Sequence, residues 1–269
     1  MKTSIIASIV CLSMTSLLGA CNQKDNSNQK QQNDDSINVV TTETVTNIVE
    51  TDKIEPNKQK SAPINDTVTV ASDSDKKITT KTMNISRFDE LDISVPANVI
   101  YKTENGTPSI KITTTNDILS KMSANVYDNK LIIKSTQNQF NSPKIDIEIT
   151  GASRLEDINL TGACKFTNQG KLNPRELDIE CVGASSITLN NVACSSLSID
   201  CVGASKANID NLACEELEVD CTGASNVKLS GKSNQAEYEA TGASTIDVSQ
   251  LKVIKTLKEE AIGASTIKK

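Results

Sequence analysis

Short runs of alternating apolar and polar residues dominate the chain from about residue 78 onward. The apolar positions are Phe88, Leu91, Ile93, Val95, Val99, Tyr101, Ile110, Ile112, Val126, Leu131, Ile133, Ile145, Ile147 and Ile149. Turn-forming pairs separate the runs at Asn105-Gly106, Asp128-Asn129 and Ser142-Pro143. Alternation with a period of two is typical of half-buried strands, and no segment longer than Ile118–Met122 has helical spacing. The pattern predicts an all-β domain.

A repeat then determines which all-β fold to expect. Gly-Ala-Ser or Gly-Ala-Cys begins at Gly151, Gly162, Gly183, Gly203, Gly223, Gly242 and Gly263, so that after one short step the spacing is 19 to 21 residues. Alignment on these glycines places Leu177–Cys181 over Leu197–Cys201 and Leu217–Cys221. A fixed period near 20 with alternation inside it indicates a parallel β-solenoid whose coils hydrogen-bond to one another at ~4.8 Å. An ordinary β-sandwich with coincidental similarity is the alternative.

Two features of this region resemble a known family. They are the segment Arg87-Phe88-Asp89-Glu90-Leu91-Asp92-Ile93 and the Gly-Ala-Ser repeat that follows it. Together they resemble the family called "putative auto-transporter adhesin, head GIN domain". The resemblance covers about residues 78 to 269 and implies a right-handed β-helix-like domain of cell-envelope proteins, found largely in Bacteroidota. It implies no defined catalytic residues.

The N-terminus carries an export signal. Lys2 precedes a mostly apolar stretch from Ile5 to Leu18, which is too short to span a membrane as a mature helix. It ends in Leu18-Gly19-Ala20-Cys21, which resembles a bacterial lipobox and predicts a signal peptide over residues 1–20 with lipid attachment at Cys21. The alternatives are an ordinary secretory signal with a chance cysteine, or an uncleaved anchor. Several acyl chains on one cysteine, palmitate among them, would hold the protein durably at a membrane, with the outer membrane the expected one.

The domain boundaries follow from composition. Residues 21–76 are polar and without periodicity, which predicts a disordered tether, and residues 77–269 form the solenoid domain. The formal charge of −6 excludes a nucleic-acid partner, since phosphate binding needs a basic face. The chain has no His, which removes Ser-His-Asp and Cys-His catalysis and every His-ligated metal site. We therefore expect no cofactor.

Six cysteines of the domain could carry chemistry. Cys181, Cys201 and Cys221 fall into one inward column, and Cys194 and Cys214 fall into a second one; Cys164 stands apart. Buried small hydrophobes, a disulfide between coils and a metal site are the three interpretations. Parallel Cβ vectors in stacked coils disfavour the disulfide, and no CxxC spacing supports a zinc site.

The outward positions of the same strands are acidic. The column Glu180, Asp200, Asp220 and Glu239 is interpreted as a solvated negative face, as a binding site for cations such as Ca²⁺, or as catalytic paired carboxylates. Coils of 19 to 21 residues lack the long loops that build a cleft, which disfavours the third interpretation. The repeated serines predict a corner ladder that hydrogen-bonds the backbone, and the polar Glu259 predicts a terminal cap.

Together these features predict a lipid-anchored, non-enzymatic envelope protein that presents a solenoid as a binding or adhesin-like module. Its ligand would be a glycan or another surface protein. The alternatives are a structural or stress-response envelope component without a dedicated ligand, and a polysaccharide-active β-helix enzyme. Which side of the outer membrane carries the domain, and its oligomeric state, do not follow from the sequence.

Overall fold

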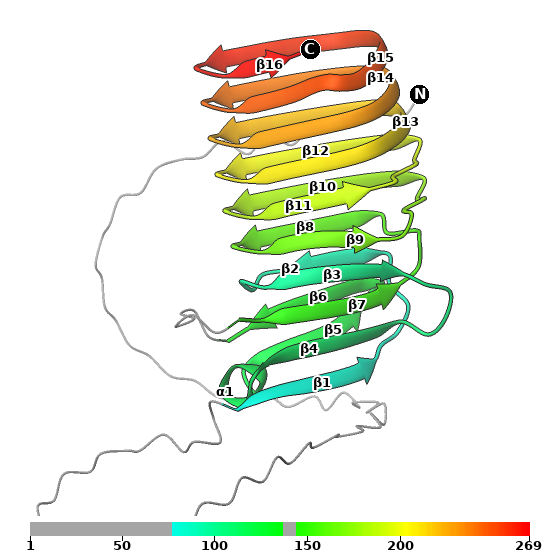
Figure 1. The fold of residues 1–269 in the computed structure, drawn as a ribbon, viewed down its shortest axis with the longest axis vertical. Coiled ribbons are helices and arrows are strands. Elements are labelled where there is room, and N and C mark those ends of the chain that lie inside the picture. Colours follow the sequence, from blue (N-terminus) through cyan, green and yellow to red (C-terminus); the bar gives the residue numbers. More distant parts are fainter. Residues whose placement is uncertain (1–76, 137–143) are drawn as a thin grey trace, which may run out of the picture. The chain divides into compact units, whose positions relative to one another are not determined.

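Parallel strands stack coil upon coil in the computed structural model, which describes residues 77–136 and 144–269 (Figure 1). The stack is a β-solenoid of about six turns, as predicted. The predicted signal peptide (1–20) and tether (21–76), together with the Ser142-Pro143 turn, lie outside the described residues.

Two faces of strands enclose the core. Face A contains β3 (Asn98–Thr103), β7 (Asp146–Gly151), β9 (Lys165–Gln169), β11 (Ser186–Asn190) and β16 (Thr266–Lys268). Face B contains β2 (Glu90–Ile93), β6 (Lys130–Ser135), β8 (Asp157–Gly162), β10 (Glu176–Gly183) and β12 (Ser196–Gly203). Three long strands bend around the corner opposite the Gly-Ala-Ser turns and contribute to both faces: β13 (Lys206–Gly223), β14 (Asn226–Gly242) and β15 (Thr245–Gly263).

The register between coils is the one that the glycine alignment predicts. Cys181 pairs with Cys201, which pairs with Cys221, and the glycines that end these strands pair in the same way. Side chains at alternate positions point into the core, where Ile199 and Cys201 are fully buried. Because the period of alternation is two, this register keeps the alternating apolar positions of the regular coils on the inside, whereas Val202, which follows Cys201 in β12, is 43% exposed.

The Gly-Ala-Ser corner requires glycine for two reasons. Gly203 has a φ of 94°, a region that L side chains rarely adopt. A Cβ atom on Gly203 would also lie 2.9 Å from the carbonyl oxygen of Gly183 in the neighbouring coil. The opposite corner uses Asn191 and Asn211 at φ values of 59° and 57°, consistent with the tolerance of asparagine for the left-handed region.

The N-terminal third departs from sequential stacking. β2 pairs with β6 on one side and β8 on the other, and β3 pairs with β7 and β9. The coil formed by β2 and β3 is therefore inserted between two coils that come later in the chain. The connection from β7 to β8 therefore has to pass this inserted coil.

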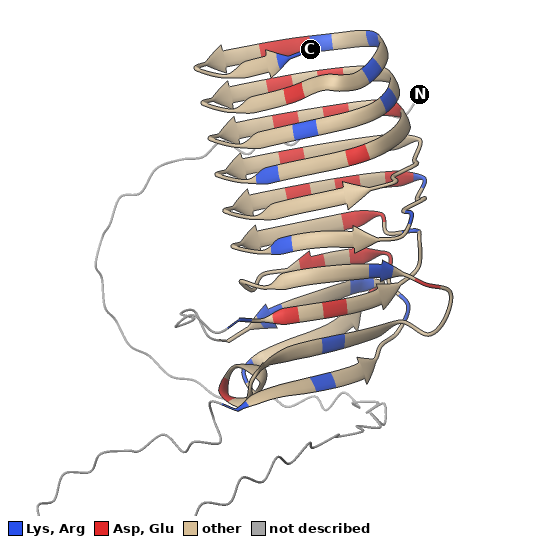
Figure 2. Ribbon diagram, viewed as in Figure 1, with Lys and Arg blue, Asp and Glu red and all other residues tan. Residues whose placement is uncertain are grey.

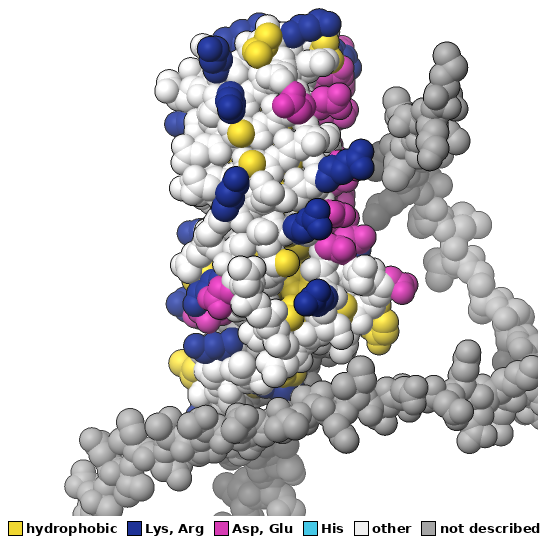
Figure 3. All heavy atoms as spheres, turned by 90° about the vertical axis from the view of Figure 1, so that its right-hand side faces the viewer, with side chains coloured by type: hydrophobic (Ala, Val, Ile, Leu, Met, Phe, Trp, Pro, Cys, Tyr) yellow, Lys and Arg dark blue, Asp and Glu magenta, His cyan; other side chains and the backbone are white. Residues whose placement is uncertain are grey.

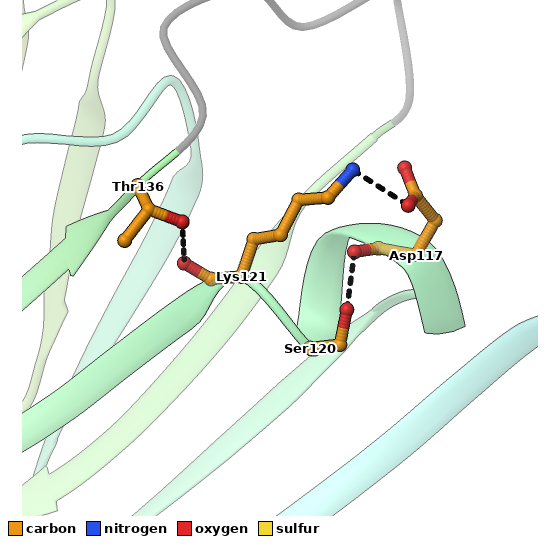
Figure 4. Close-up of polar contacts among 4 residues, drawn as sticks. All are labelled: Asp117, Ser120, Lys121 and Thr136. Atoms are coloured by element: carbon orange, nitrogen blue, oxygen red, sulfur yellow. Dashed lines mark hydrogen bonds and ion pairs between the residues drawn. The ribbon is translucent and has the colours of Figure 1, made fainter.

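Antiparallel strands close the N-terminal end of the solenoid. β1 (Ile78–Asn84) pairs with β4 (Ser109–Thr115), which pairs with β7, and β5 (Met122–Tyr127) pairs with β6. A single helical turn, α1 (Asn116–Leu119), connects β4 to β5. Figure 4 shows the polar contacts that hold it: Lys121 Nζ lies 2.6 Å from Asp117 Oδ1, and the Ser120 hydroxyl donates to the Asp117 carbonyl at 2.8 Å.

The C-terminal end matches the predicted polar cap only in part: Ile254 and Leu257 of the last coil are 75% and 45% exposed, and β16 pairs with β15 only over residues 245–247. Glu259 pairs in register with the buried Tyr238 and occupies an inward position of the last coil. It forms an ion pair with Lys269. Lys258 lies 2.7 Å from Glu239 and adds a second ion pair at this end.

Candidate functional site

Carboxylates form a ladder along face B, as the register of the sequence repeat predicts. Glu180, Asp200, Asp220 and Glu239 follow one another in adjacent coils. Figure 2 shows Asp and Glu recurring from coil to coil on this face, and Figure 3 shows acidic side chains gathered along one edge of the stack. We call this set of four residues the acidic ladder.

Two carboxyl groups of the acidic ladder, Asp200 and Asp220, ionise less readily than free aspartate. Burial and the neighbouring carboxylates Asp200, Glu218 and Glu239 raise the pKa of Asp220 to about 6, although Lys258 opposes the rise. Burial, with Glu180 and Glu218 beside it, also raises the pKa of Asp200. Burial of these carboxylates, together with like charges held one strand apart, therefore costs free energy in the folded state at neutral pH.

The ladder does not form a cluster that could hold a metal ion. Over residues 77–136 and 144–269, no group of three or more His, Cys, Asp or Glu side chains has a metal-binding arrangement. Adjacent carboxylates in the ladder come from successive coils and point away from the core.

The cysteines of the domain are free thiols within the core. Cys181, Cys201 and Cys221 are buried, and Cys214 is 7% exposed; Cys194 is half-buried. A hydrogen bond to Cys201 and burial raise the pKa values of Cys181 and Cys221. Cys181 and Cys221 therefore pack as small hydrophobic side chains and are poor nucleophiles. Hydrogen bonds with both lower the pKa of Cys201, whose full burial keeps reagents away from it.

The serines of the repeat form the predicted backbone ladder. The Ser205 hydroxyl lies 2.8 Å from the carbonyl oxygen of Cys181 and 2.8 Å from that of Val202. Ser185 makes the equivalent contacts with Leu160 and Val182. The hydroxyl protons are committed to these carbonyl groups, so the serine column is structural.

A hollow of about 600 Å³ opens where the stacking order breaks. Its walls come from four connections: β1 to β2, β3 to β4, β5 to β6, and β7 to β8. The residues that line it are Arg87, Phe88, Asp89, Glu104, Asn105, Gly106, Pro108, Asn129, Ala152, Arg154 and Glu156. We call it the corner hollow. The β3–β4 connection extends from the right-hand side of the stack in Figure 1, the side that faces the viewer in Figure 3.

Backbone hydrogen bonds fix the walls of the corner hollow. The amide of Glu156 donates to the carbonyl of Asp89 at 2.6 Å, and the amide of Asp89 donates to the carbonyl of Asn129 at 3.0 Å. The amide of Glu104 donates to Gly151 at 3.0 Å. All four connections are thus tied to a neighbouring segment by main-chain contacts.

An aromatic cluster supports the hollow from the core side. Tyr101 contacts Phe88 edge to face at 6.3 Å between ring centroids and stacks on Phe166 at 6.1 Å. Its hydroxyl donates to the carbonyl of Ala152 at 2.7 Å, which holds the β7–β8 connection in place. Phe88 reaches from this cluster into the lining of the hollow.

Comparison with known proteins places the chain in a family. A family model described as "Putative auto-transporter adhesin, head GIN domain" matches residues 87–268, more than half of the chain. The chain belongs to this family. We refer to its solenoid as the GIN domain from here on. A search of curated proteins finds no match.

Solved structures share the fold of the GIN domain. A protein from Parabacteroides distasonis titled "putative lipid binding protein" is 12% identical, with a TM-score of 0.61 over 72% of this chain and 97% of that chain. A "putative adhesin" from Bacteroides fragilis is 18% identical, with a TM-score of 0.55 over 72% of this chain and 98% of that chain. At these identities the likeness shows the fold alone.

The structure confirms some of the residue placements predicted from the sequence and leaves others untested. The columns of cysteine, serine and acidic residues lie together as expected, whereas Cys21 lies outside the described residues, so its lipid attachment stays a prediction. No helix in the described part of the chain is long and apolar enough to cross a membrane. The expectation that short coils lack the loops to build a cleft concerns the regular coils and does not cover the corner hollow, which lies where the β2–β3 coil is inserted between later coils. A signal was available: Arg87-Phe88-Asp89, which carries the family resemblance, lines the hollow.

Proposed function

We propose that this chain is a lipid-anchored protein of the cell envelope whose GIN domain acts as a non-catalytic, adhesin-like binding module. Membership of a family described as adhesins supports the binding role. The Leu-Gly-Ala-Cys sequence at residues 18–21, after an apolar segment, supports the anchor. The absence of His from the whole sequence supports a non-catalytic role, because the commonest acid–base group is missing.

The observation that carries the binding role is the combination of this family membership with a rigid hollow. Short regular coils present flat strand faces, whereas the corner hollow offers concave, polar surface held by main-chain hydrogen bonds. Concave sites with a few well-placed polar groups are where proteins bind small ligands and single residues of polymers.

Metabolic labelling with an alkyne analogue of palmitate tests the anchor. The full chain and a Cys11→Ala control, which alters the predicted signal peptide but not the attachment site, should incorporate the label. Cys21→Ala should incorporate none. Label retained in Cys21→Ala would refute attachment at that residue.

An adhesion assay tests the binding role. Beads coated with the full chain should adhere to envelope polysaccharide immobilised on a surface, and beads coated with albumin should not. Protease treatment of intact cells shows in parallel whether the domain is accessible from outside. A chain that is protected from protease and whose beads do not adhere would favour the alternative of an envelope component without a dedicated ligand.

A further inference from the structure

We infer that the corner hollow of the GIN domain is a binding site for a neutral saccharide unit, held by the side chains of Arg87 and Arg154. The inference rests on the proposed function and deepens it by naming a site and a ligand class. It follows from polar groups that have no partner within the protein, from the apolar part of the lining and from the local charge.

The two arginines of the hollow are exposed and have no side-chain partner among the described residues, so their donors are open to a ligand. Neither Arg87 nor Arg154 forms an ion pair or a side-chain hydrogen bond with another residue of the described ranges. The carboxylates of Glu104 and Glu156 in the same lining are likewise without a side-chain partner in the described part of the chain. Guanidinium groups only donate and carboxylates only accept, so the hollow offers both kinds of group to a ligand.

A sugar satisfies both sets of groups at once. Each hydroxyl of a saccharide donates one hydrogen bond and accepts others, so adjacent hydroxyls can bridge an arginine and a carboxylate. The lining also contains the exposed Ala152 and the small accessible part of Phe88, which is 6% exposed; these offer limited apolar contact to the C–H face of a sugar ring. A volume of about 600 Å³ lies within the range of roughly 300–1,000 Å³ that is typical of small-ligand sites.

The charge of the hollow favours a neutral ligand. Two arginines stand against Asp89, Glu104 and Glu156, which gives 2 − 3 = −1, in a chain whose formal charge is −6. A sulfated or uronic polymer would be repelled by this balance. A hydrocarbon chain would have to desolvate the charged lining without replacing its hydrogen bonds, which is unfavourable.

Hydrogen bonds within the protein hold the walls of the corner hollow in place without a ligand. Main-chain hydrogen bonds join Glu156 to Asp89 and Glu104 to Gly151, and the Tyr101 hydroxyl holds Ala152. A preformed site avoids the entropy of ordering loops on binding. Tyr101 is therefore a positioning residue for the site and does not itself line it.

Binding of the full chain to an oligosaccharide array tests the inference. The array carries neutral, amino, uronic and sulfated oligosaccharides, and calorimetry with the strongest neutral binder then compares the variants. Arg87→Ala and Arg154→Ala should each weaken binding at least tenfold. The control, Arg175→Ala, removes an exposed arginine that pairs with Glu176 outside the hollow and should leave binding unchanged. All three positions are exposed, so circular dichroism and melting temperature should match the parent.

Three results would overturn the inference: no binding to neutral oligosaccharides, a preference for the uronic or sulfated ones, or equal binding by Arg87→Ala, Arg154→Ala and the parent. The adhesion assay separates this failure from that of the proposed function. If beads coated with the Arg87→Ala/Arg154→Ala double variant adhere as well as the parent, the adhesive role stands and the corner hollow is not its site. If parent beads fail to adhere, the adhesive role fails whatever the array shows.

Discussion

Replacement of Asp220 by Asn should stabilise the GIN domain at neutral pH and have no effect in acid. Burial and the carboxylates Asp200, Glu218 and Glu239 raise the pKa of Asp220 from 3.8 to about 6, although Lys258 counteracts them. The folded state therefore holds this proton more tightly than the unfolded chain does. Stability is highest below the unfolded pKa and is lost as the pH rises through the window from about 4 to about 6.

The size of the effect follows from that window. The difference between 3.8 and 6 corresponds to about 3 kcal/mol at 1.36 kcal/mol per pH unit. Asp220 is only half-buried, and solvent screening reduces the penalty to about 1 kcal/mol. The isosteric Asn removes the charge and keeps the shape, so we expect Asp220→Asn to gain about 1 kcal/mol at pH 7, which is roughly 2–4 °C in melting temperature for a domain of this size.

Urea denaturation from pH 4 to pH 8 at low ionic strength measures this effect, because urea leaves charge interactions unscreened. Asp128→Asn is a suitable control: it removes one negative charge from an exposed turn whose φ of 47° Asn tolerates equally well. The gain should shrink toward zero at pH 4, and high salt should remove only the part that comes from the neighbouring carboxylates, since salt does not screen the burial penalty. A destabilised variant at pH 7, or a gain that is the same at pH 4 and pH 7, would refute the assignment of repulsion to the ladder.

Three further predictions concern the corners and the core. Gly223→Ala should cost more than about 2 kcal/mol in chemical denaturation, because φ is 93° and the added Cβ would lie 2.6 Å from the carbonyl oxygen of Gly203. The control Gly106→Ala, with open space around it, should be nearly neutral. Similar costs for the two variants would contradict the role of the corner. Ser205→Ala should cost about 1–2 kcal/mol by the same assay, since it leaves two carbonyl groups without their buried donor, and a neutral result would exclude this contribution. In alkylation followed by mass spectrometry, the half-buried Cys194 should react slowly, because burial raises its pKa to about 12, but still before the fully buried Cys201, which should react only after unfolding; labelling of Cys201 ahead of Cys194 would show that its core position opens.

The regular part of the fold could be predicted from the sequence because two periodicities agree there. The spacing of the glycines aligns Cys181 with Cys201 and Cys221, and alternation then sends these side chains inward, as the structure shows. The turn at Asp128-Asn129 was also predictable, since both residues tolerate the positive φ values that they adopt, 47° and 64°.

The order of the coils in the N-terminal third could not be predicted in this way. Alternation shows that residues around Leu91 and Leu131 form strands, but it does not say which strands pair. β2 inserts between β6 and β8 through contacts between segments some 40 to 70 residues apart, and no repeat marks those partners. The corner hollow could not be predicted for the same reason, because Arg87 and Arg154 line one hollow only as a result of that insertion.

The division between regular and irregular parts bears on where recognition occurs. In the repeat, each coil copies the last, so any group on its surface, such as the acidic ladder, recurs one strand away and meets a like group. Like groups in a column repel or pack with one another, and they offer a ligand no unique arrangement of donors and acceptors. The inserted β2–β3 coil breaks this copying and brings arginines, carboxylates and an aromatic ring from unrelated segments to one place. A specific ligand site in this solenoid is therefore expected where the repeat is interrupted. The regular coils stabilise the segments around that interruption.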